Sequence, residues 1–279
     1  FADYPALLLK SLLFLALGGF YVLVYLHLGD PATYQGVQSR AGLIFMLCTF
    51  FFMMGVNSVV SLFIERKRIF KKDRQKRMYW PSVFYIANQI YQVPFYVLIF
   101  TLVVIMVYFG TALNKTTPAA TFFWYLYFFF AGGFLGGSSL AIVISVLVNS
   151  MQEVSAINPI IVLPATIIAG FFANVKNILE PLRTLSYLSP VRYMFQGCIL
   201  TEFGDDFNNV FYDFYESKKW INALALVGLI VGYRLLFYPV FIYTLRERKI
   251  RYAVDEELAA RYIPPALRTP LSVPGPSEL

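Results

Sequence analysis

Long apolar runs dominate the chain. Six such runs cover residues 6–28, 41–64, 84–109, 121–148, 154–173 and 221–245. Each run reaches or exceeds the roughly 20 residues that a helix needs to cross the hydrocarbon core of a bilayer. Backbone groups in lipid must find their hydrogen bonds within the protein, and over such lengths a helix provides them. The pattern therefore predicts an all-α membrane protein with six transmembrane helices.

Positive charge is concentrated between the second and third runs. The segment Glu65–Arg77 carries eight cations and two anions, whereas the whole 279-residue chain has a net charge of +7. Basic loops beside spanning helices stay on the cytoplasmic side of a membrane. A second basic cluster, Arg246–Arg251, follows the sixth run and lies on the same side if there are six spans. We therefore expect both termini to be cytoplasmic.

Composition supports a membrane protein and argues against a nucleic-acid-binding one. Hydrophobic residues make up 58% of the chain and charged residues only 14%, which is too apolar for a soluble domain of this size. The excess of positive charge lies almost entirely in one loop rather than over a broad surface. We therefore expect contact with membrane lipids and none with nucleic acid.

The segment 174–220, on the predicted outer side, is too apolar for a plain loop. Ile178–Tyr187 and Val191–Phe203 are expected to form two short helices, which Ser189 and Pro190 separate. Such helices can re-enter the outer leaflet where protein shields their ends. The proline-rich residues 249–279 are expected to form a cytoplasmic tail after a membrane domain that spans residues 1–248.

The sequence offers no candidate catalytic residue and no metal site. It contains no phosphate-binding G-x-x-x-x-G-K-[ST] loop, no H-E-x-x-H motif and no Ser/His/Asp set. The glycine-rich stretch Gly132–Ser139 lies inside the fourth run and has two overlapping G-x-x-x-G spacings, which are typical of close helix packing. A hinge or ligand-binding role is the alternative for this stretch. We expect no cofactor bound to this chain itself.

Two further features concern residues inside the apolar runs. Cys48 lies within the second run and Cys198 in the last outer segment, so we expect them to differ too much in depth to form a disulfide. Arg234 lies near the middle of the sixth run. A charge at that depth is costly and usually turns towards a partner inside the protein, so we favour a structural hydrogen bond over contact with cargo.

An ordered set of short motifs resembles a known family. The stretch Arg40–Phe45 opens the second run and the charged Glu65–Arg74 follows it. Further motifs come in this order along the chain: Tyr85-Ile86-Ala87, Val93-Pro94, Asn158-Pro159, Gly170-Phe171-Phe172, Leu188–Tyr193 and Thr201-Glu202-Phe203. Over about residues 3–248 this succession resembles the membrane domain of G-subfamily ABC transporters, the white and pleiotropic-drug-resistance type. Arg77 departs from the glycine that is usual in that family, and Gln92 from the usual glutamate.

The resemblance implies a role for the basic segment. In similar transporters this segment contacts a nucleotide-binding domain, which would lie outside this chain, in cis or in trans, and would hold ATP and Mg²⁺. The residues that the resemblance assigns to this coupling are Glu65, Arg66, Arg68, Phe70, Lys72, Asp73 and Arg74. Docking on anionic lipid headgroups and a plain solvated loop are the alternatives.

The resemblance also implies a cargo cavity on a dimer axis, between the second and fifth runs. The cavity residues that it assigns are Phe50, Met53, Asn57, Leu163, Thr166 and Ile167. Phe171 and Phe172 fall where similar transporters place an apolar gate between the inner and outer cavities. Aromatic and methionine side chains offer adaptable surfaces for apolar cargo. Lipid contact or ordinary interhelical packing is the alternative for each of these residues.

Three functions follow as hypotheses. The first is the transmembrane half of an ATP-driven exporter, which works as a homodimer or heterodimer and moves lipids, sterols or other amphipathic compounds by alternating access. The second keeps the permease fold in a non-transporting structural or accessory subunit of a larger membrane assembly. The third is an ATP-independent channel or scramblase, which is disfavoured because no run carries a stripe of polar residues along one helical face.

Overall fold

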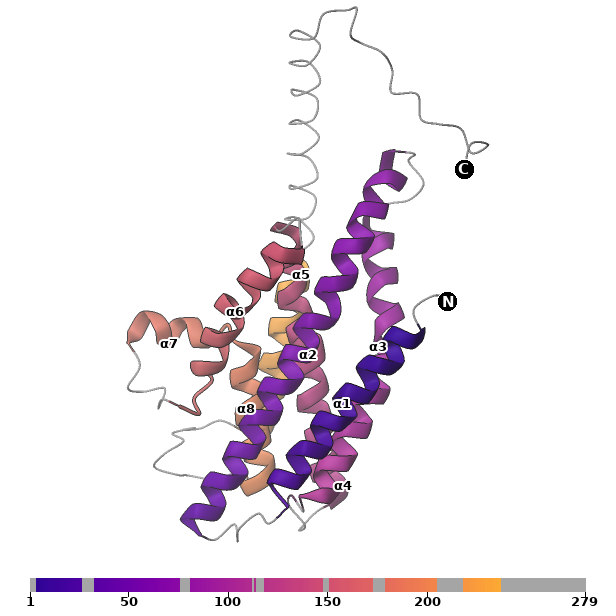
Figure 1. Ribbon diagram of the computed structural model, residues 1–279. Helices are drawn as coiled ribbons and strands as arrows, with labels where there is room; N and C mark the ends of the chain where they lie inside the picture. Colours follow the sequence, from indigo (N-terminus) through magenta and orange to yellow (C-terminus); the bar gives the residue numbers. More distant parts are fainter. Residues whose placement is uncertain are drawn as a thin grey trace, which may run out of the picture. The chain divides into compact units, whose positions relative to one another are not determined.

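The computed structural model describes residues 4–26, 33–75, 81–111, 113, 118–147, 151–172, 179–204 and 218–236. These residues contain helices and no strand (Figure 1). The labelled elements are α1 (Tyr4–Val24), α2 (Tyr34–Gln75), α3 (Pro81–Gly110), α4 (Pro118–Phe128), η1 (Phe129–Gly136), α5 (Gly137–Leu147), α6 (Met151–Ile167), α7 (Glu180–Ser186) and α8 (Pro190–Phe203). A further helix covers Lys219–Leu236. All of them belong to one compact unit, Phe1–Phe237, and the second unit, Tyr238–Leu279, lies outside the described residues.

Three helices in the described part of the chain are long and apolar enough to cross a membrane. They cover Tyr34–Asn57, Ala120–Val143 and Lys219–Leu236, and three shorter apolar helices cover Ser11–Val24, Pro94–Gly110 and Asn158–Ile167. Together these helices fall on all six predicted runs. The all-α class is therefore confirmed over the described residues, and the count of six crossings stays a prediction.

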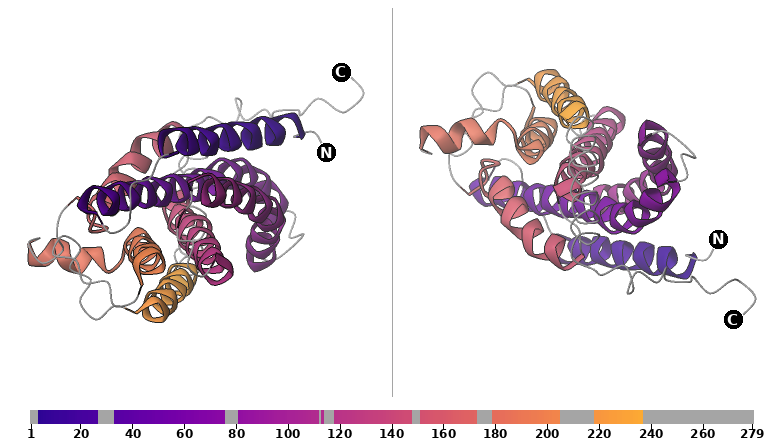
Figure 2. Two further views of the ribbon diagram at one scale, coloured as in Figure 1. Left: turned by 90° about the horizontal axis from the view of Figure 1, so that it is seen from below. Right: turned by 90° about the horizontal axis from the view of Figure 1, so that it is seen from above.

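Helix α2 is the centre of the packing. It contacts η1, α5, α8, α6 and α3, and Figure 2 shows it crossing the bundle between α1 and the helices α5 and α8. Phe51, Phe52 and Val56 on α2 have no exposed surface. In contrast, α1 exposes a row of large apolar side chains that includes Leu8, Leu12 and Leu23, as expected of a helix that faces lipid.

The predicted fourth span contains a turn of π-helix. Helices α4, η1 and α5 follow one another without a break, and both residues that flank η1, Phe128 and Gly137, keep helical dihedral angles. A π-turn inserts an extra residue into the helix and changes which side chains share a face. The hydropathy pattern predicted one regular helix here, because it does not register a single inserted residue.

The glycines of this helix bring it close to two neighbours. A Cβ atom on Gly133 would lie 2.7 Å from the Cβ of Phe51, and one on Gly137 would lie 2.7 Å from the Phe52 carbonyl oxygen, both on α2. A Cβ atom on Gly132 would lie 2.7 Å from the Cβ of Met194 on α8. The prediction that the glycine-rich stretch serves close helix packing is therefore confirmed.

The expectation about the two cysteines rested on a wrong premise. Cys48 of α2 and Cys198 of α8 are both buried free thiols, and the two side chains lie close enough to interact. They do not differ in depth, because α8 packs directly against α2. The sequence placed Cys198 in an outer segment and did not show that this segment lies alongside the second run.

The two short helices of the last outer segment are present. They are α7 and α8, and the break between them falls at residues 187–189, as the Ser189-Pro190 pair predicted. Helix α8 is buried along almost its whole length. It packs against α2, α4, η1 and α6, so it is a core element of the bundle. Re-entry into the outer leaflet stays a prediction.

Candidate functional site

Helices α2 and α6 run antiparallel and touch at two places. At one, Asn158 of α6 donates through Nδ2 to Oδ1 of Asn57, 3.1 Å away. At the other, the ring of Phe171, just after α6, stacks on Phe45 of α2 with 4.5 Å between ring centroids. We call the region between these contacts, residues 45–57 and 158–172, the α2–α6 interface.

Several predicted cavity residues lie together on the open side of the α2–α6 interface. On α6, Leu163 is 55% exposed and Ile167 49% exposed, and Ile160 extends the same helical face. On α2, Asn57 is exposed and Met53 is half-buried. Met46, one helical turn before Phe50, is 44% exposed and was not predicted. The interface thus presents an apolar surface with one amide pair at its end.

Two other predicted cavity residues meet protein instead. The Phe50 ring packs edge-on against Tyr21 of α1, with 5.8 Å between centroids, and also against Phe14. Thr166 is buried and its hydroxyl donates to the Leu163 carbonyl oxygen at 2.8 Å. Helical phase explains both positions: Phe50 lies on the edge of the α2 face that meets α1, and Thr166 lies on the same buried face of α6 as Val162, next to the exposed face that carries Leu163.

The predicted gate residues belong to an aromatic cluster. Phe171 is half-buried between Phe45 and Phe195 of α8, and its ring lies 5.9 Å from that of Phe195. Phe172 packs edge-on against Phe45 and Phe171, with 5.1 Å between centroids in each pair, and is itself 64% exposed. The cluster joins the end of α6 to α2 and α8, with Phe172 at its open side.

The predicted coupling residues can be placed only by their backbone. Helix α2 continues without a break to Gln75. It therefore carries both residues 45–57 of the α2–α6 interface and the seven predicted coupling residues, Glu65, Arg66, Arg68, Phe70, Lys72, Asp73 and Arg74. The second run thus continues as a helix through most of the basic segment, to Gln75. The side chains of these seven residues lie outside the described ones.

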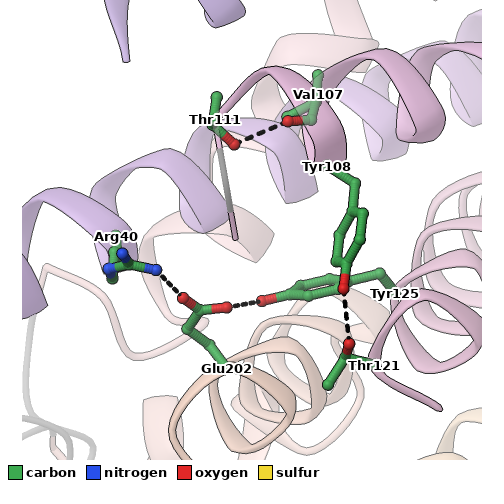
Figure 3. Close-up of polar contacts among 7 residues, drawn as sticks. All are labelled: Arg40, Val107, Tyr108, Thr111, Thr121, Tyr125 and Glu202. Carbon is green, nitrogen blue, oxygen red and sulfur yellow. Dashed lines mark hydrogen bonds and ion pairs between the residues drawn. The ribbon is translucent and has the colours of Figure 1, made fainter. Parts of the chain in front are cut away.

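A buried polar network joins α2, α4 and α8, and sequence reasoning did not find it (Figure 3). The Arg40 guanidinium forms an ion pair with Oε1 of Glu202, and the Tyr125 hydroxyl donates to Oε2 of the same carboxylate at 2.8 Å. All three side chains are buried. Arg40 and Glu202 both belong to motifs that carried the resemblance. The sequence feature that could have indicated this ion pair was the opposite charge of the two residues, each at the edge of an apolar segment.

Arg234, the charge predicted to lie within the sixth run, has a hydrogen-bond partner on another helix. Nε of Arg234 donates to Oγ of the buried Ser139, on α5, at 3.1 Å. This contact agrees with a structural hydrogen-bonding role for Arg234. Pro239, one turn further along, lies outside the described residues.

The exposed surface of these elements can bind a ligand. The described residues contain no group of three or more His, Cys, Asp or Glu side chains that could hold a metal ion. The buried polar groups of the network contact one another, and the exposed surface of the α2–α6 interface is mainly apolar. Such a surface suits an amphipathic molecule, because apolar area provides affinity and a few polar groups fix orientation.

Comparison with known proteins gives one family and distant relatives. The ABC-2 type transporter family matches residues 1–203. ABC transporter G family member 22 from Arabidopsis thaliana is 25% identical over 79% of this chain, which covers 28% of that relative. Protein white from Drosophila melanogaster is 22% identical over 64% of the chain and 26% of the relative. ABC multidrug transporter SNQ2 from Candida glabrata is 23% identical over 64% of the chain, which spans only 11% of that relative.

Proposed function

This chain belongs to the ABC-2 type transporter family, and we propose that it is the transmembrane half of an ATP-driven exporter of lipids, sterols or other amphipathic compounds. The observation that carries the proposal is the α2–α6 interface. There, apolar side chains from two helices stay open on one side, between a polar contact at one end and an aromatic cluster at the other.

Cargo binds on the open side of the α2–α6 interface. Met46, Leu163 and Ile167 supply apolar contact area there, and the Asn57–Asn158 amides supply the polar group at one end. Met side chains adapt to different shapes, which suits cargo defined by its amphipathic character rather than by one shape. A second copy of the chain, or a related chain, closes this open side to form a cavity on the dimer axis.

The aromatic cluster forms the gate at the other end of the α2–α6 interface. Phe171 is fixed by stacking on Phe45, whereas Phe172 leaves most of its surface uncovered. Phe172 from each subunit closes the apolar plug, and the outward transition separates the two rings.

Helix α2 transmits the movement that drives transport. Phe45 and Gln75 lie on the same unbroken helix, and at a rise of 1.5 Å per residue they are about 45 Å apart. A nucleotide-binding domain outside this chain, with its ATP and Mg²⁺, pushes on the basic end of α2 on the cytoplasmic side. The helix then tilts as one rod and changes the width of the cavity at the α2–α6 interface.

Tryptophan substitution on the open side tests this function. The protein, together with its nucleotide-binding domain, is reconstituted in vesicles, and ATP-driven movement of fluorescent phospholipid and sterol analogues is measured for Leu163→Trp. The bulky ring fills the cavity, so transport falls and the preference among the analogues changes. Leu102→Trp, on α3, is the matched control, because Leu102 is also an exposed apolar residue (43%) but lies away from the α2–α6 interface.

The proposal fails if the wild-type protein moves none of these analogues with ATP, or if Leu163→Trp and Leu102→Trp transport equally. The first result favours the accessory subunit, which needs the fold but not the cavity.

A further inference from the structure

Arg192, in the first turn of α8, is a buried cation without a carboxylate partner among the described residues. The residue is 8% exposed. Its Nη1 donates to the Ser186 hydroxyl oxygen, and its guanidinium lies over the Tyr187 ring, 4.2 Å from the centroid. Both contacts are with uncharged groups. A buried charge that no opposite charge neutralises is strongly unfavourable, so a negatively charged ligand would stabilise this position.

One hydrogen-bond donor of Arg192 is unused. The buried Nε–H group has no acceptor, although a guanidinium side chain has five N–H donors in a fixed fork. Leaving a buried charged donor unpaired costs more than an ordinary missing hydrogen bond. The position therefore lacks both an acceptor and a negative charge. A phosphate or carboxylate oxyanion supplies the two together, and arginine binds such groups through paired donors.

The start of α8 adds to the positive potential. Ser189 occupies the N-cap position, but its hydroxyl donates to the Ala165 carbonyl oxygen at 2.9 Å and does not cap the helix. Pro190 follows at the first helical position. The free N–H groups of a helix start attract anions, and in this 14-residue helix Arg192 itself lies within that first turn.

The turn that holds Arg192 is fixed from two sides. The Tyr233 hydroxyl, from the helix over Lys219–Leu236, donates to the Leu188 carbonyl oxygen. Ser189 is tied to α6 through Ala165. Because these bonds hold the backbone on either side of Pro190, the guanidinium is kept in place before any ligand binds. A preformed site loses less conformational entropy on binding.

The surface next to Arg192 is apolar. Leu179, Leu182, Leu185 and Leu188, in and beside α7, are all exposed. A buried cation beside exposed leucines matches a molecule that has an anionic head and an apolar tail. We propose that Arg192 binds the phosphate oxyanion of an anionic phospholipid whose acyl chains lie against the α7 leucines. This site uses none of the cargo residues and does not depend on the proposed function.

Native mass spectrometry of the purified, delipidated chain in detergent tests this proposal. Phosphatidylglycerol, phosphatidylcholine and inorganic phosphate are titrated separately as probes. We expect one phosphatidylglycerol to bind the wild type more tightly than phosphatidylcholine, and Arg192→Gln to weaken it at least about tenfold, since hydrogen bonds to charged groups are strong. Arg183→Gln is the matched control, because Arg183 also lies beside the turn but is ion-paired with Glu180 and should change little.

Two further variants keep the test decisive. Arg192→Lys retains the positive charge and loses the paired N–H donors of the guanidinium, so it should bind phosphatidylglycerol with intermediate affinity. This variant provides the comparison if Arg192→Gln does not fold. Leu182→Gln should weaken binding of phosphatidylglycerol and leave inorganic phosphate unaffected if the ligand is a lipid. Equal binding of phosphatidylglycerol by wild type, Arg192→Gln and Arg192→Lys overturns the proposal. Binding of inorganic phosphate with no gain from acyl chains overturns the lipid as the source of the oxyanion.

Discussion

The Arg40 guanidinium at the start of α2 and the Glu202 carboxylate at the end of α8 form an ion pair across 162 residues of sequence. Tyr125 of α4 donates to the second oxygen of the same carboxylate. The three side chains thus tie one end of α2 to α8 and α4. Next to them, the hydroxyls of Tyr108 and Thr121 are hydrogen-bonded at 2.8 Å and join α3 to α4 (Figure 3).

Removing one partner of the ion pair should destabilise the fold strongly. Glu202→Ala takes the carboxylate of this ion pair away from the buried Arg40 charge, and breaking a buried pair in this way costs about 3–5 kcal/mol. The double variant Arg40→Met/Glu202→Leu removes both charges and should lose less stability than Glu202→Ala, with the remaining loss coming from the Tyr125 hydroxyl, whose acceptor is removed. Thermal unfolding in detergent can be followed through the fluorescence of Trp124 and Trp220, whose rings pack edge to face with 4.7 Å between their centroids. Equal losses of stability in Glu202→Ala and the double variant would show that the loss does not come from separating the Arg40 charge from the Glu202 carboxylate.

The glycine contact between η1 and α2 should not tolerate a methyl group. In Gly133→Ala the new Cβ would lie 2.7 Å from the Phe51 Cβ, and overpacking of this kind costs about 1–3 kcal/mol. Gly19→Ala is the control, since nothing lies within 4 Å of a Cβ built there, and its better helix propensity should make it neutral or slightly stabilising. Equal unfolding temperatures for the two variants would contradict this packing.

Hydropathy was sufficient to predict the all-α class of the described residues. A helix that spans lipid needs a long apolar run, so the six runs were recognisable without knowledge of their contacts. The Ser189-Pro190 pair likewise separated α7 from α8. The π-turn in η1 and the depth of α8 could not be predicted, because one depends on a single inserted residue and the other on which helices pack together.

The candidate site was predictable only in part. The resemblance selected residues on two helices, and the structure places Leu163 and Ile167 on the exposed face of α6 but Thr166 on its buried face. Which face of a fully apolar helix is covered depends on its neighbours and not on its own pattern. For the same reason, Arg40 and Glu202 were visible as motif residues, whereas their pairing was not.

The contribution of the Arg234–Ser139 hydrogen bond to stability can be measured by comparing substitutions of Ser139 and of its neighbour Ser138. Ser138 and Ser139 are both buried and both donate to the Leu135 carbonyl oxygen, and the Ser139 hydroxyl accepts a hydrogen bond from Arg234. Ser139→Ala should therefore lose more stability than Ser138→Ala, by about 0.6 kcal/mol and at most roughly 1.7, which is the range for hydrogen bonds between membrane helices. The difference should vanish in an Arg234→Met background, and its persistence there would exclude the contact as its cause.

The two phenylalanines of the predicted gate should differ in their contribution to stability. Phe171 stacks on Phe45 at an interplanar angle of 11°, whereas Phe172 is 64% exposed. Phe171→Ala should cost roughly 3 kcal/mol, in the range for large-to-small changes in a core, and Phe172→Ala much less. Unfolding temperatures of both variants in the same detergent provide the comparison. A larger loss for Phe172→Ala would mean that the cluster is held together differently.

The most direct test of the account reverses the charge on the basic end of α2. Arg66→Glu/Arg68→Glu/Arg74→Glu is made in the protein with its nucleotide-binding domain, and ATP-driven efflux, cargo-stimulated ATP hydrolysis and unfolding temperature are measured on the same vesicle preparation. Lys218→Glu, an exposed lysine before the last described helix, serves as the control. We expect the triple variant to fold and to hydrolyse ATP at its basal rate, and to lose both efflux and the stimulation of hydrolysis by cargo. Efflux at the wild-type rate in the correctly folded triple variant would contradict it.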